Sequence, residues 1–399
     1  MYDVIVVGAR CAGAATAMLL ARKGHRVLMV DRAGFPSDVA MSTHLVWQAG
    51  VESLSRWGLA EAVEASNCPP LVDVTLDLGA FALRGSPATT GPARCALAPR
   101  RIVLDQILVD AAVAAGVEFR PDFSVTELLR EGDRVTGVKG DSVQSQGVEE
   151  RARMVLGADG SHSRIARRVE AAESHPQPEL QGTYFSYFSG LDVQGIEFFP
   201  RPGRMVYAWP TNDGRVLVGI SWRLEDLREV RHEVDKHFHA ELAALAPGLS
   251  ERVRSARRDA PWVRGGAAGF FRQAFGPGWA LVGDAGVTMD PITAAGITNA
   301  FRDADLLADK IDAGLSGRQP LEQALAQFQQ ERDQASMPVY GLTCQMAALA
   351  EAPAEMMKVF EALQGNQADI DRYFGVFAQT VPVMEFFDPA NLQRIVSQA

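Results

Sequence analysis

Six residues near the start of the chain have the types and spacing of a phosphate-binding turn. The turn is Gly8-Ala9-Arg10-Cys11-Ala12-Gly13, and it lies between a short apolar run and an Ala/Leu-rich stretch. Gly8 permits a tight turn, and Gly13 permits a helix to pack closely on a strand. Free backbone N–H groups at a helix N-terminus attract a diphosphate. The sequence therefore predicts a dinucleotide site in which Gly8, Arg10, Cys11, Ala12 and Gly13 contact the bound molecule.

The elements on either side of this turn would position it correctly. Tyr2–Val7 is apolar and β-branched and predicts a buried strand, while Ala14–Lys23 favours a helix that Gly24 can end. His25–Val30 predicts a second strand, which ends at Asp31 and Arg32. An acid at this point of a βαβ unit accepts hydrogen bonds from a ribose. We therefore expect Asp31 and Arg32 to lie in the same cofactor site.

One position departs from the G-x-G-x-x-G pattern. Arg10 stands where the second glycine usually allows the backbone to approach the phosphates. An arginine there can pair with the diphosphate or point toward another part of the cofactor, and the sequence leaves both open. An ordinary tight turn between a strand and a helix remains the alternative.

Two later stretches repeat the arrangement of a strand that ends at glycine and aspartate. Arg151–Leu156 leads into Gly157-Ala158-Asp159-Gly160, and Trp279–Val282 leads into Gly283-Asp284. Close backbone approach beside a carboxylate suits a ribose or ribityl chain, although each stretch alone also reads as a Gly/Asp turn.

A predicted helix follows the second of these aspartates. Pro291 precedes it, Gly296 and Ile297 open it, and it should end near Ala313. Its N-terminus would place positive potential against negative charge on a bound cofactor. We therefore expect Gly296 and Ile297 beside the cofactor.

A single histidine is the main candidate for proton transfer. Ser42-Thr43-His44 follows the first βαβ unit, and we expect Thr43 to cap a helix that runs to about Arg56. This segment should pass near the cofactor, which makes His44 a candidate catalytic residue. A structural role for an isolated histidine is the alternative.

The composition excludes several classes of function. The chain has 399 residues with 47% hydrophobic and 22% charged residues, which is typical of a globular protein. A net charge of −10 argues against nucleic acid or an anionic membrane as the main partner. The four cysteines show no metal-binding spacing, and no apolar run is long enough for an integral membrane span. With no leader sequence apparent, we expect a cytoplasmic protein without a metal.

The middle of the chain is different in character. From Leu180, aromatic residues alternate with small and polar ones, as in Thr183–Phe188, Arg204–Trp209 and Arg215–Trp222. The last two segments flank Thr211–Gly214, which predicts a hairpin. We expect an antiparallel sheet that faces a substrate.

Taken together, the three glycine-containing stretches resemble the FAD-binding fold of the p-hydroxybenzoate hydroxylase-like flavoproteins, the group A flavin-dependent monooxygenases. The likeness implies that Arg101, in Arg-x-x-Leu-Asp, contacts the phosphates or ribose, and that Asp159 and Asp284 belong to the Asp-Gly and Gly-Asp motifs. It also implies that Pro291 lies beside the flavin ring. Ala294 departs from the family's Pro-x-x-Gly-x-Gly, where it replaces the first glycine. The Gly-Ala-Arg-x-Ala-Gly turn and Ser-Thr-His stretch are similar to a subgroup related to geranylgeranyl reductases and natural-product tailoring enzymes.

This resemblance implies an α/β fold with a Rossmann-like FAD-binding domain, an inserted antiparallel β-sheet substrate domain and a C-terminal helical region. The expected ranges are 1–75, 98–168 and 270–318 for FAD, 76–97 and 169–269 for the substrate sheet, and 319–399 for the helices.

The implied activity is a single-component monooxygenase. NADPH or NADH would reduce FAD, and O2 would form a C4a-hydroperoxyflavin that transfers one oxygen atom to an aromatic or polyketide-like substrate. His44 would be the general base, with Tyr184 and Tyr187 as further candidates. The expected partners are O2 and a small aromatic or apolar molecule, and the expected assembly is a monomer or homodimer.

Three other functions remain open. The first is an FAD-dependent reductase of an isoprenoid-type double bond. The second is a flavin halogenase, but Tyr207-Ala208-Trp209-Pro210 does not match the Trp-x-Trp-x-Ile-Pro stretch of that class. The third is a flavin-binding protein without turnover, which Arg10 and Ala294 would favour.

Overall fold

A mixed sheet built on the first strand organises the N-terminal half of the chain. The computed structural model describes residues 1–89 and 91–398. Its first sheet has eight strands, six of which follow the order β17-β18-β8-β1-β2-β5, and among these six only β17 runs antiparallel to its neighbour. These strands are β1 (Tyr2–Val7), β2 (Val27–Val30), β5 (Glu118–Arg120), β8 (Val148–Gly157), β17 (Phe275–Gly276) and β18 (Trp279–Leu281). The other two, β6 (Phe123–Glu131) and β7 (Arg134–Ser142), branch from β8, because β7 pairs antiparallel with both β8 and β6.

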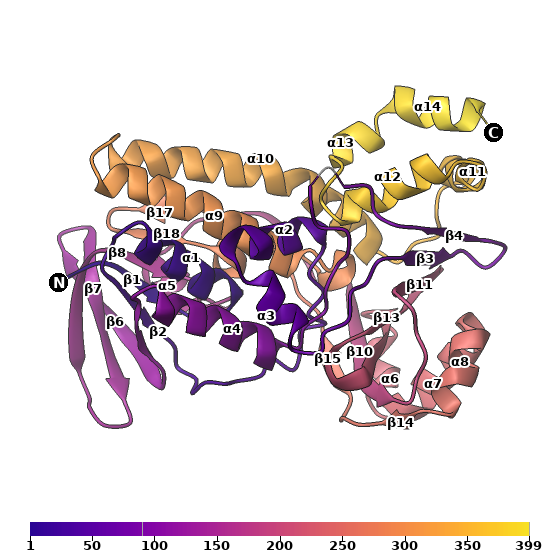
Figure 1. The fold of residues 1–399 in the computed structure, drawn as a ribbon, viewed down its shortest axis with the longest axis horizontal. Helices are drawn as coiled ribbons and strands as arrows, with labels where there is room; N and C mark the ends of the chain where they lie inside the picture. Colours follow the sequence, from indigo (N-terminus) through magenta and orange to yellow (C-terminus); the bar gives the residue numbers. More distant parts are fainter. Residues whose placement is uncertain (90, 399) are drawn as a thin grey trace.

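Helices from three distant parts of the chain cover one face of this sheet. They are α1 (Cys11–Arg22), α4 (Arg101–Ala114) and α9 (Gly296–Leu315), which share one buried apolar cluster. The long helix α10 (Leu321–Ala347) runs along α9 (Figure 1). The other face packs on β6 (Phe123–Glu131), β7 (Arg134–Ser142) and α5 (Arg164–Arg168). Because both faces are covered, Val4–Val7 of β1 and the whole of β2 are apolar.

A second, mostly antiparallel sheet lies beside the first (Figure 1). Its order is β14-β10-β13-β12-β11-β3-β4, with β15 also paired to β10. The predicted hairpin is confirmed, because Trp209 pairs with Leu217 and Arg204 with Trp222. The strands are β3 (Val74–Asp77), β4 (Ala82–Gly85), β10 (Gln181–Ser189), β11 (Ile196–Arg201), β12 (Arg204–Pro210), β13 (Arg215–Arg223), β14 (Arg257–Arg258) and β15 (Val263–Gly265).

The two faces of this second sheet pack on different helices. One face lies on α6 (Leu227–Val230), α7 (Val234–Leu245) and α8 (Pro247–Arg254). The other face carries Phe185, Met205, Tyr207 and Trp209, and it packs on the C-terminal helices. Those helices are α11 (Ala354–Leu363), α12 (Gln367–Phe377), α13 (Val383–Phe386) and α14 (Pro389–Ser397). Strand alternation explains this division, since successive side chains point to opposite faces.

One local prediction was wrong. The expected helix from Thr43 begins only at Gln48, in α2 (Gln48–Trp57), and a short α3 (Ala60–Glu64) follows it. A small third sheet lies outside the two large ones: β9 (Glu173–Gln177) pairs with β16 (Gly269–Arg272), and β16 pairs with β19 (Val287–Thr288).

The α/β class, the inserted antiparallel sheet and the C-terminal helical region are confirmed. The residue boundaries of the three regions stay a prediction. The first sheet draws its strands from three separated parts of the sequence, so the cofactor residues singled out above come from segments that meet only in the fold.

Candidate flavin site

The turn after β1 lies against the end of β8. Gly8 has φ +106°, and a Cβ there would overlap the carbonyl oxygen of Ala158. A Cβ at Gly13 would overlap the carbonyl oxygen of Gly8. Helix α1 starts without a side-chain cap, so its first N–H groups have no intrahelical partner. The predicted phosphate-binding turn therefore has the required shape and free donors.

Asp31 holds this turn from the end of β2. Its Oδ2 accepts the N–H of Ala9 at 2.8 Å, and its Oδ1 accepts the N–H of Ala33 at 2.9 Å. The carboxylate is 7% exposed, and Arg32 beside it is exposed. A carboxylate has about four acceptor positions, so Asp31 retains capacity for ribose hydroxyls.

Arg10 pairs with a buried acid that the sequence analysis had not assigned to the site. Its Nη1 lies 3.1 Å from Oδ2 of Asp105, and its Nη2 donates to Ser37 at 3.1 Å. Arg101 donates to both oxygens of the same carboxylate at 2.9 Å, and Cys11 donates through Sγ at 3.3 Å. Asp105 is fully buried. Two guanidinium groups on one carboxylate leave an excess positive charge, which favours an anionic ligand nearby.

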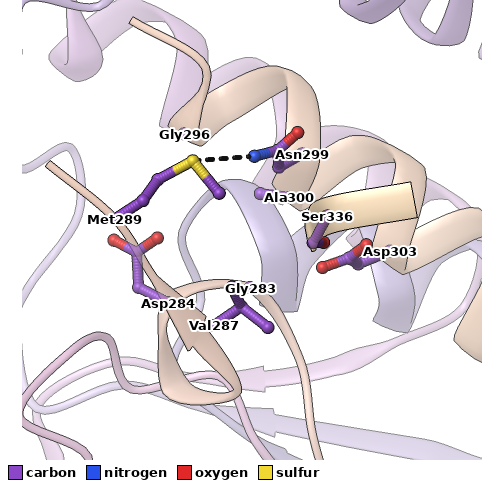
Figure 2. A pocket seen from close by; sticks show the side chains of 9 residues that line it. All are labelled: Gly283, Asp284, Val287, Met289, Gly296, Asn299, Ala300, Asp303 and Ser336. Carbon is purple, nitrogen blue, oxygen red and sulfur yellow. Dashed lines mark hydrogen bonds between the residues drawn. The ribbon is translucent and has the colours of Figure 1, made fainter. Parts of the chain in front are cut away.

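Asp284 lies in a pocket between β18 and α9. It is exposed to this pocket, yet the surrounding protein raises its pKa to about 6; Asp303 adds to the rise and Arg101 opposes it. Figure 2 shows Asp284 below Met289 and apart from Asp303. The pocket is lined by Gly283, Asp284, Val287, Met289, Gly296, Asn299, Ala300, Asp303 and Ser336.

The N-terminus of α9 opens into the same pocket. Gly296 lines it, and a Cβ built there would meet no atom within 4 Å. No side chain caps this helix, so the N–H groups of Gly296 and Ile297 are free of intrahelical partners. Two uncapped helix N-termini, α1 and α9, thus belong to helices that pack on each other. This donor set fits an extended anionic dinucleotide with a polyol chain.

Asp159 has a local structural function. Its oxygens accept Ser163 Oγ at 2.5 Å and the N–H groups of Arg164 and Ile165 at 2.7 and 3.3 Å, which fixes the start of α5. Its neighbour Ala158 is the residue that lies against Gly8. The structure thus places Asp159 next to the turn, with its carboxylate occupied by the protein itself.

His44 is buried between the two sheets in an unusual conformation. Its φ is +48°, in the left-handed region, and only 2% of the residue is exposed. Its Nε2 lies 3.0 Å from the hydroxyl of Tyr187, and its Nδ1 makes no hydrogen bond. Burial, reinforced by Arg100 and Arg101, lowers the pKa of His44 to about 3. The imidazole is therefore neutral at physiological pH.

A second pocket lies between the turn at Pro291 and the aromatic sheet. The turn contributes Pro291, Ile292 and Ala294, and the loop before α2 contributes Thr43. Trp209 donates to the carbonyl of Thr43 at 3.2 Å, which joins this loop to the sheet. The remaining lining side chains all come from strands of the second sheet: Gln181, Thr183, Phe198, Met205, Tyr207, Trp209 and Ser221.

Sequence reasoning missed Asp105, Gln181, Tyr207 and Asp290 as candidate site residues. Asp105 stands in the Arg-x-x-Leu-Asp pattern, which was used only for Arg101. Gln181, Thr183 and Tyr207 occupy alternate strand positions on one face, but no local signal tells which face borders a pocket.

The fold and the site together define an FAD-dependent oxidoreductase. A sequence profile described as "FAD binding domain" matches residues 1–341. The chain therefore belongs to this FAD-binding domain family, as its resemblance to the group A flavoproteins predicted.

Curated relatives of the chain include archaeal reductases. Digeranylgeranylglycerophospholipid reductase 2 of Methanopyrus kandleri is 29% identical over 321 residues, which cover 74% of this chain and 73% of the relative. The enzyme of Methanosarcina mazei with the same activity in its name is 28% identical and covers 77% and 74%.

Solved structures share the fold at lower identity. A flavoprotein/dehydrogenase from Cytophaga hutchinsonii has a TM-score of 0.83 at 20% identity, with 99% and 98% of the two chains covered. Flavin-dependent brominase Bmp2 has a TM-score of 0.80 at 18% identity and covers 100% and 98%. PqsL of Pseudomonas aeruginosa, a probable FAD-dependent monooxygenase, has a TM-score of 0.72 at 22% identity and covers 94% and 99%.

Within residues 1–89 and 91–398, no helix is long and apolar enough to cross a membrane. No group of three or more His, Cys, Asp or Glu side chains is arranged to hold a metal ion in the same part of the chain.

The first prediction concerns strain at Ala294, which stands at the first glycine of the Pro-x-x-Gly-x-Gly pattern that the chain resembles. Ala294 has φ +52°, a conformation that costs an L-residue about 1 kcal/mol. Ala294→Gly should therefore raise the free energy of unfolding by about 0.5–1 kcal/mol, measured by urea denaturation. Ala313→Gly, within helical α9, is the control and should lower it by about 1 kcal/mol. An equal loss of unfolding free energy in both variants would contradict backbone strain at Ala294.

The second prediction concerns Asp284 and the cofactor. Asp284→Ala removes a carboxylate from the pocket at the N-terminus of α9 and should weaken FAD binding about tenfold, as expected for a charged hydrogen-bonding group. FAD content after gel filtration and flavin fluorescence titration would measure the effect. Asp133→Ala, on an exposed turn, is the control. Full FAD occupancy in Asp284→Ala would exclude this position from the site.

The third prediction concerns acid stability. The unfolded chain binds a proton at His44 below about pH 6.5, while the folded chain does not until about pH 3. His44 therefore contributes stability above pH 6.5 that is lost as the pH falls toward 3. Between pH 7 and 5 this loss is about 2 kcal/mol, and His44→Asn, which tolerates positive φ, should show a correspondingly smaller decrease. His239→Gln is the exposed control, and an unchanged pH slope in His44→Asn would refute the buried neutral imidazole.

Proposed function

We propose that this protein is an FAD-dependent, NAD(P)H-using monooxygenase acting on a compact aromatic or polyketide-like molecule. The observation that carries the proposal is the second pocket. It has aromatic rings and hydroxyl groups on one side and the turn that follows the flavin-site aspartate on the other. An apolar pocket with a few polar groups is typical of a small-molecule site.

The cofactor residues supply binding and electrostatics in this proposal. The α1 turn, Arg10 and Arg101 would hold the diphosphate, and Asp31 and Asp284 would hold the ribose and ribityl hydroxyls. Bound FAD would accept electrons from NADPH or NADH and activate O2 for transfer of one oxygen atom. Gly296 and Ile297 would direct free N–H groups toward negative charge on the reduced ring.

His44 and Tyr187 would serve proton transfer. The Tyr187 hydroxyl lies 3.0 Å from His44, and burial raises the pKa of Tyr187 to about 12. A neutral imidazole can accept a proton at one nitrogen while the other donates. The hydrogen-bonded pair would thus pass a substrate proton between the loop at Thr43 and the partly exposed Tyr187.

Reduction of an isoprenoid-type double bond is the second candidate, supported by the names of the curated relatives. Such a substrate needs a long apolar tunnel, whereas the pocket beside Pro291 is small and lined partly by polar side chains. We therefore rank the reductase second. A flavin halogenase ranks below both, and a non-catalytic flavin protein ranks last. We also propose a cytoplasmic location and a monomer or homodimer.

The decisive experiment is rapid-mixing spectroscopy on the FAD-loaded protein. FAD would be reduced anaerobically with NADPH or NADH and then mixed with O2, with and without a panel of phenols. We expect a transient near-ultraviolet absorbance band, followed by an oxygenated product in which 18O2 supplies one atom. Direct reoxidation without product, together with anaerobic consumption of geranylgeranyl lipids, would overturn the monooxygenase in favour of the reductase.

A further inference from the structure

We propose that Gln181 and Asp290 form a neutral pair of amide and carboxylic acid at the wall of the second pocket. With Tyr207, this pair selects an uncharged, largely apolar molecule that carries one acceptor oxygen and one hydroxyl group. The inference rests on the proposed function only in taking this pocket as the substrate site. It names the substrate class and adds residues that determine specificity.

The hydrogen bonds of Gln181 and Asp290 leave two oxygens unpartnered. Gln181 Nε2 donates to Asp290 Oδ1 at 2.7 Å, and the N–H of Ile292 donates to the same oxygen at 2.9 Å. Gln181 Oε1 and Asp290 Oδ2 are both buried acceptors without a partner. Gln181 is fully buried and Asp290 is 8% exposed. In the proposed pair, Oδ2 carries a proton and donates it to Gln181 Oε1, so that each orphaned oxygen gains a partner.

The reverse orientation of the amide does not resolve this problem. It would place Gln181 Oε1 at 2.7 Å from Asp290 Oδ1, an oxygen that already accepts the Ile292 N–H. Two acceptors at that distance repel each other, so the hydrogen-bond network itself selects the amide orientation.

The surroundings favour the neutral acid. Burial raises the pKa of Asp290 to about 7, Glu179 adds to the rise, and the bonds from Gln181 and Ile292 oppose it. Glu179 itself is paired with Arg264. The other titratable groups that interact with Asp290 are Cys344 on α10 and Tyr207 on β12, both neutral at physiological pH because burial raises their pKa values.

Tyr207 supplies the complementary group of the pocket. Thr183 donates its only hydroxyl proton to the carbonyl of Ile220 at 2.8 Å. The Tyr207 hydroxyl, 2.6 Å from Thr183 Oγ1, must therefore donate to Thr183. This leaves the Tyr207 oxygen with an unused lone pair. Gly219 makes the arrangement possible, since a Cβ there would overlap the Tyr207 ring.

Gln181 and Tyr207 thus offer one donor and one acceptor to this pocket without a net charge. Gln181 Nε2 has a second N–H that is free for an acceptor oxygen of the ligand, such as a carbonyl or ether. Tyr207 Oη accepts from a ligand hydroxyl. An anionic ligand is disfavoured, because no cation lines this pocket and Asp290 stands behind it.

A panel of small probes tests this selection by calorimetry on the FAD-loaded protein. The probes are 4-acetylbenzyl alcohol, which has both groups; 4-ethylbenzyl alcohol, which lacks the carbonyl; 4-ethylacetophenone, which lacks the hydroxyl; and 4-acetylbenzoate, which is charged. At pH 6 we expect the first to bind about fivefold more tightly than either single-group probe, and 4-acetylbenzoate to bind weakest. Equal affinities, or tightest binding of 4-acetylbenzoate, would overturn the proposal.

Matched variants assign the effect to the two polar groups. Gln181→Leu should lower the affinity for 4-acetylbenzyl alcohol about fivefold and leave the affinity for 4-ethylbenzyl alcohol unchanged. Tyr207→Phe should also lower the affinity for 4-acetylbenzyl alcohol about fivefold, and it should leave the affinity for 4-ethylacetophenone unchanged. Asp290→Asn mimics the acid, because its N–H replaces the proton on Oδ2, so it should retain binding. Wild-type affinity should fall as the pH rises from 6 to 8.5 through ionisation of Asp290, while Asp290→Asn stays constant. A pH-dependent loss of affinity of the same size in Asp290→Asn would refute a protonated Asp290.

Infrared spectroscopy gives a readout that does not depend on any ligand. The wild-type protein at pH 6 should show carbonyl stretches of carboxylic acids that are lost at pH 8.5. The component that belongs to Asp290 should be missing from Asp290→Asn, whereas the component from Asp284, whose pKa is also raised, should remain in that variant. The absence of the Asp290 component from the wild-type protein would overturn the proposed pair, even if the variants fold poorly. If the protein forms no oxygenated product but keeps the probe selectivity and the acid band, the proposed function alone is rejected. If it forms an oxygenated product but lacks the probe selectivity and the acid band, this inference alone is rejected.

Discussion

The close backbone contact between the β1–α1 turn and the end of β8 is the constraint on which the rest of the structure depends. Only glycine is possible at Gly8 and Gly13, because a Cβ at either position would overlap a carbonyl oxygen. This contact sets α1 tightly on the sheet and leaves its N-terminus uncapped. Helix α9 packs on α1 and brings Gly296 to the same region. The cofactor site is thus a consequence of how closely two backbone segments approach each other.

Electrostatics explain how an acidic protein accommodates an anionic cofactor. The chain carries a net charge of −10, but Arg10 and Arg101 share one buried carboxylate at the site. Asp105 holds both guanidinium groups in place and offsets only one of their charges. Removing a partner from such a buried pair generally costs several kcal/mol, so Asp105 is also important for stability. Arg10, which replaces a glycine of the usual pattern, thereby belongs to the positively charged group that Arg10 and Arg101 form around Asp105.

The second pocket lies where the second sheet meets the turn at Pro291 and the loop before α2. The α9-side turn supplies its apolar wall, and the alternate residues of β10, β12 and β13 supply its polar groups. The helices α11–α14 pack on the same face of that sheet, through residues such as Phe374 and Tyr373. Their position gives them the structural function of covering the sheet that carries the pocket, which the helical pattern alone did not reveal. Turnover at this site and its substrate are proposals that depend on this arrangement.

The sequence by itself determined the βαβ unit, the three glycine-containing turns, the hairpin around Thr211–Gly214 and the FAD-binding family. Each of these is a local pattern in which strand or helix preference and glycine spacing agree. Only the tertiary structure decided the partner of Arg10, the burial of His44 and the pairing of Gln181 with Asp290. Thr43 has the chemistry of a helix cap, yet α2 begins at Gln48 because the chain at His44 takes a positive φ between the two sheets. These features depend on contacts between residues far apart in the chain, such as Gln181 and Asp290, and local sequence carries no information about which distant group completes a hydrogen bond.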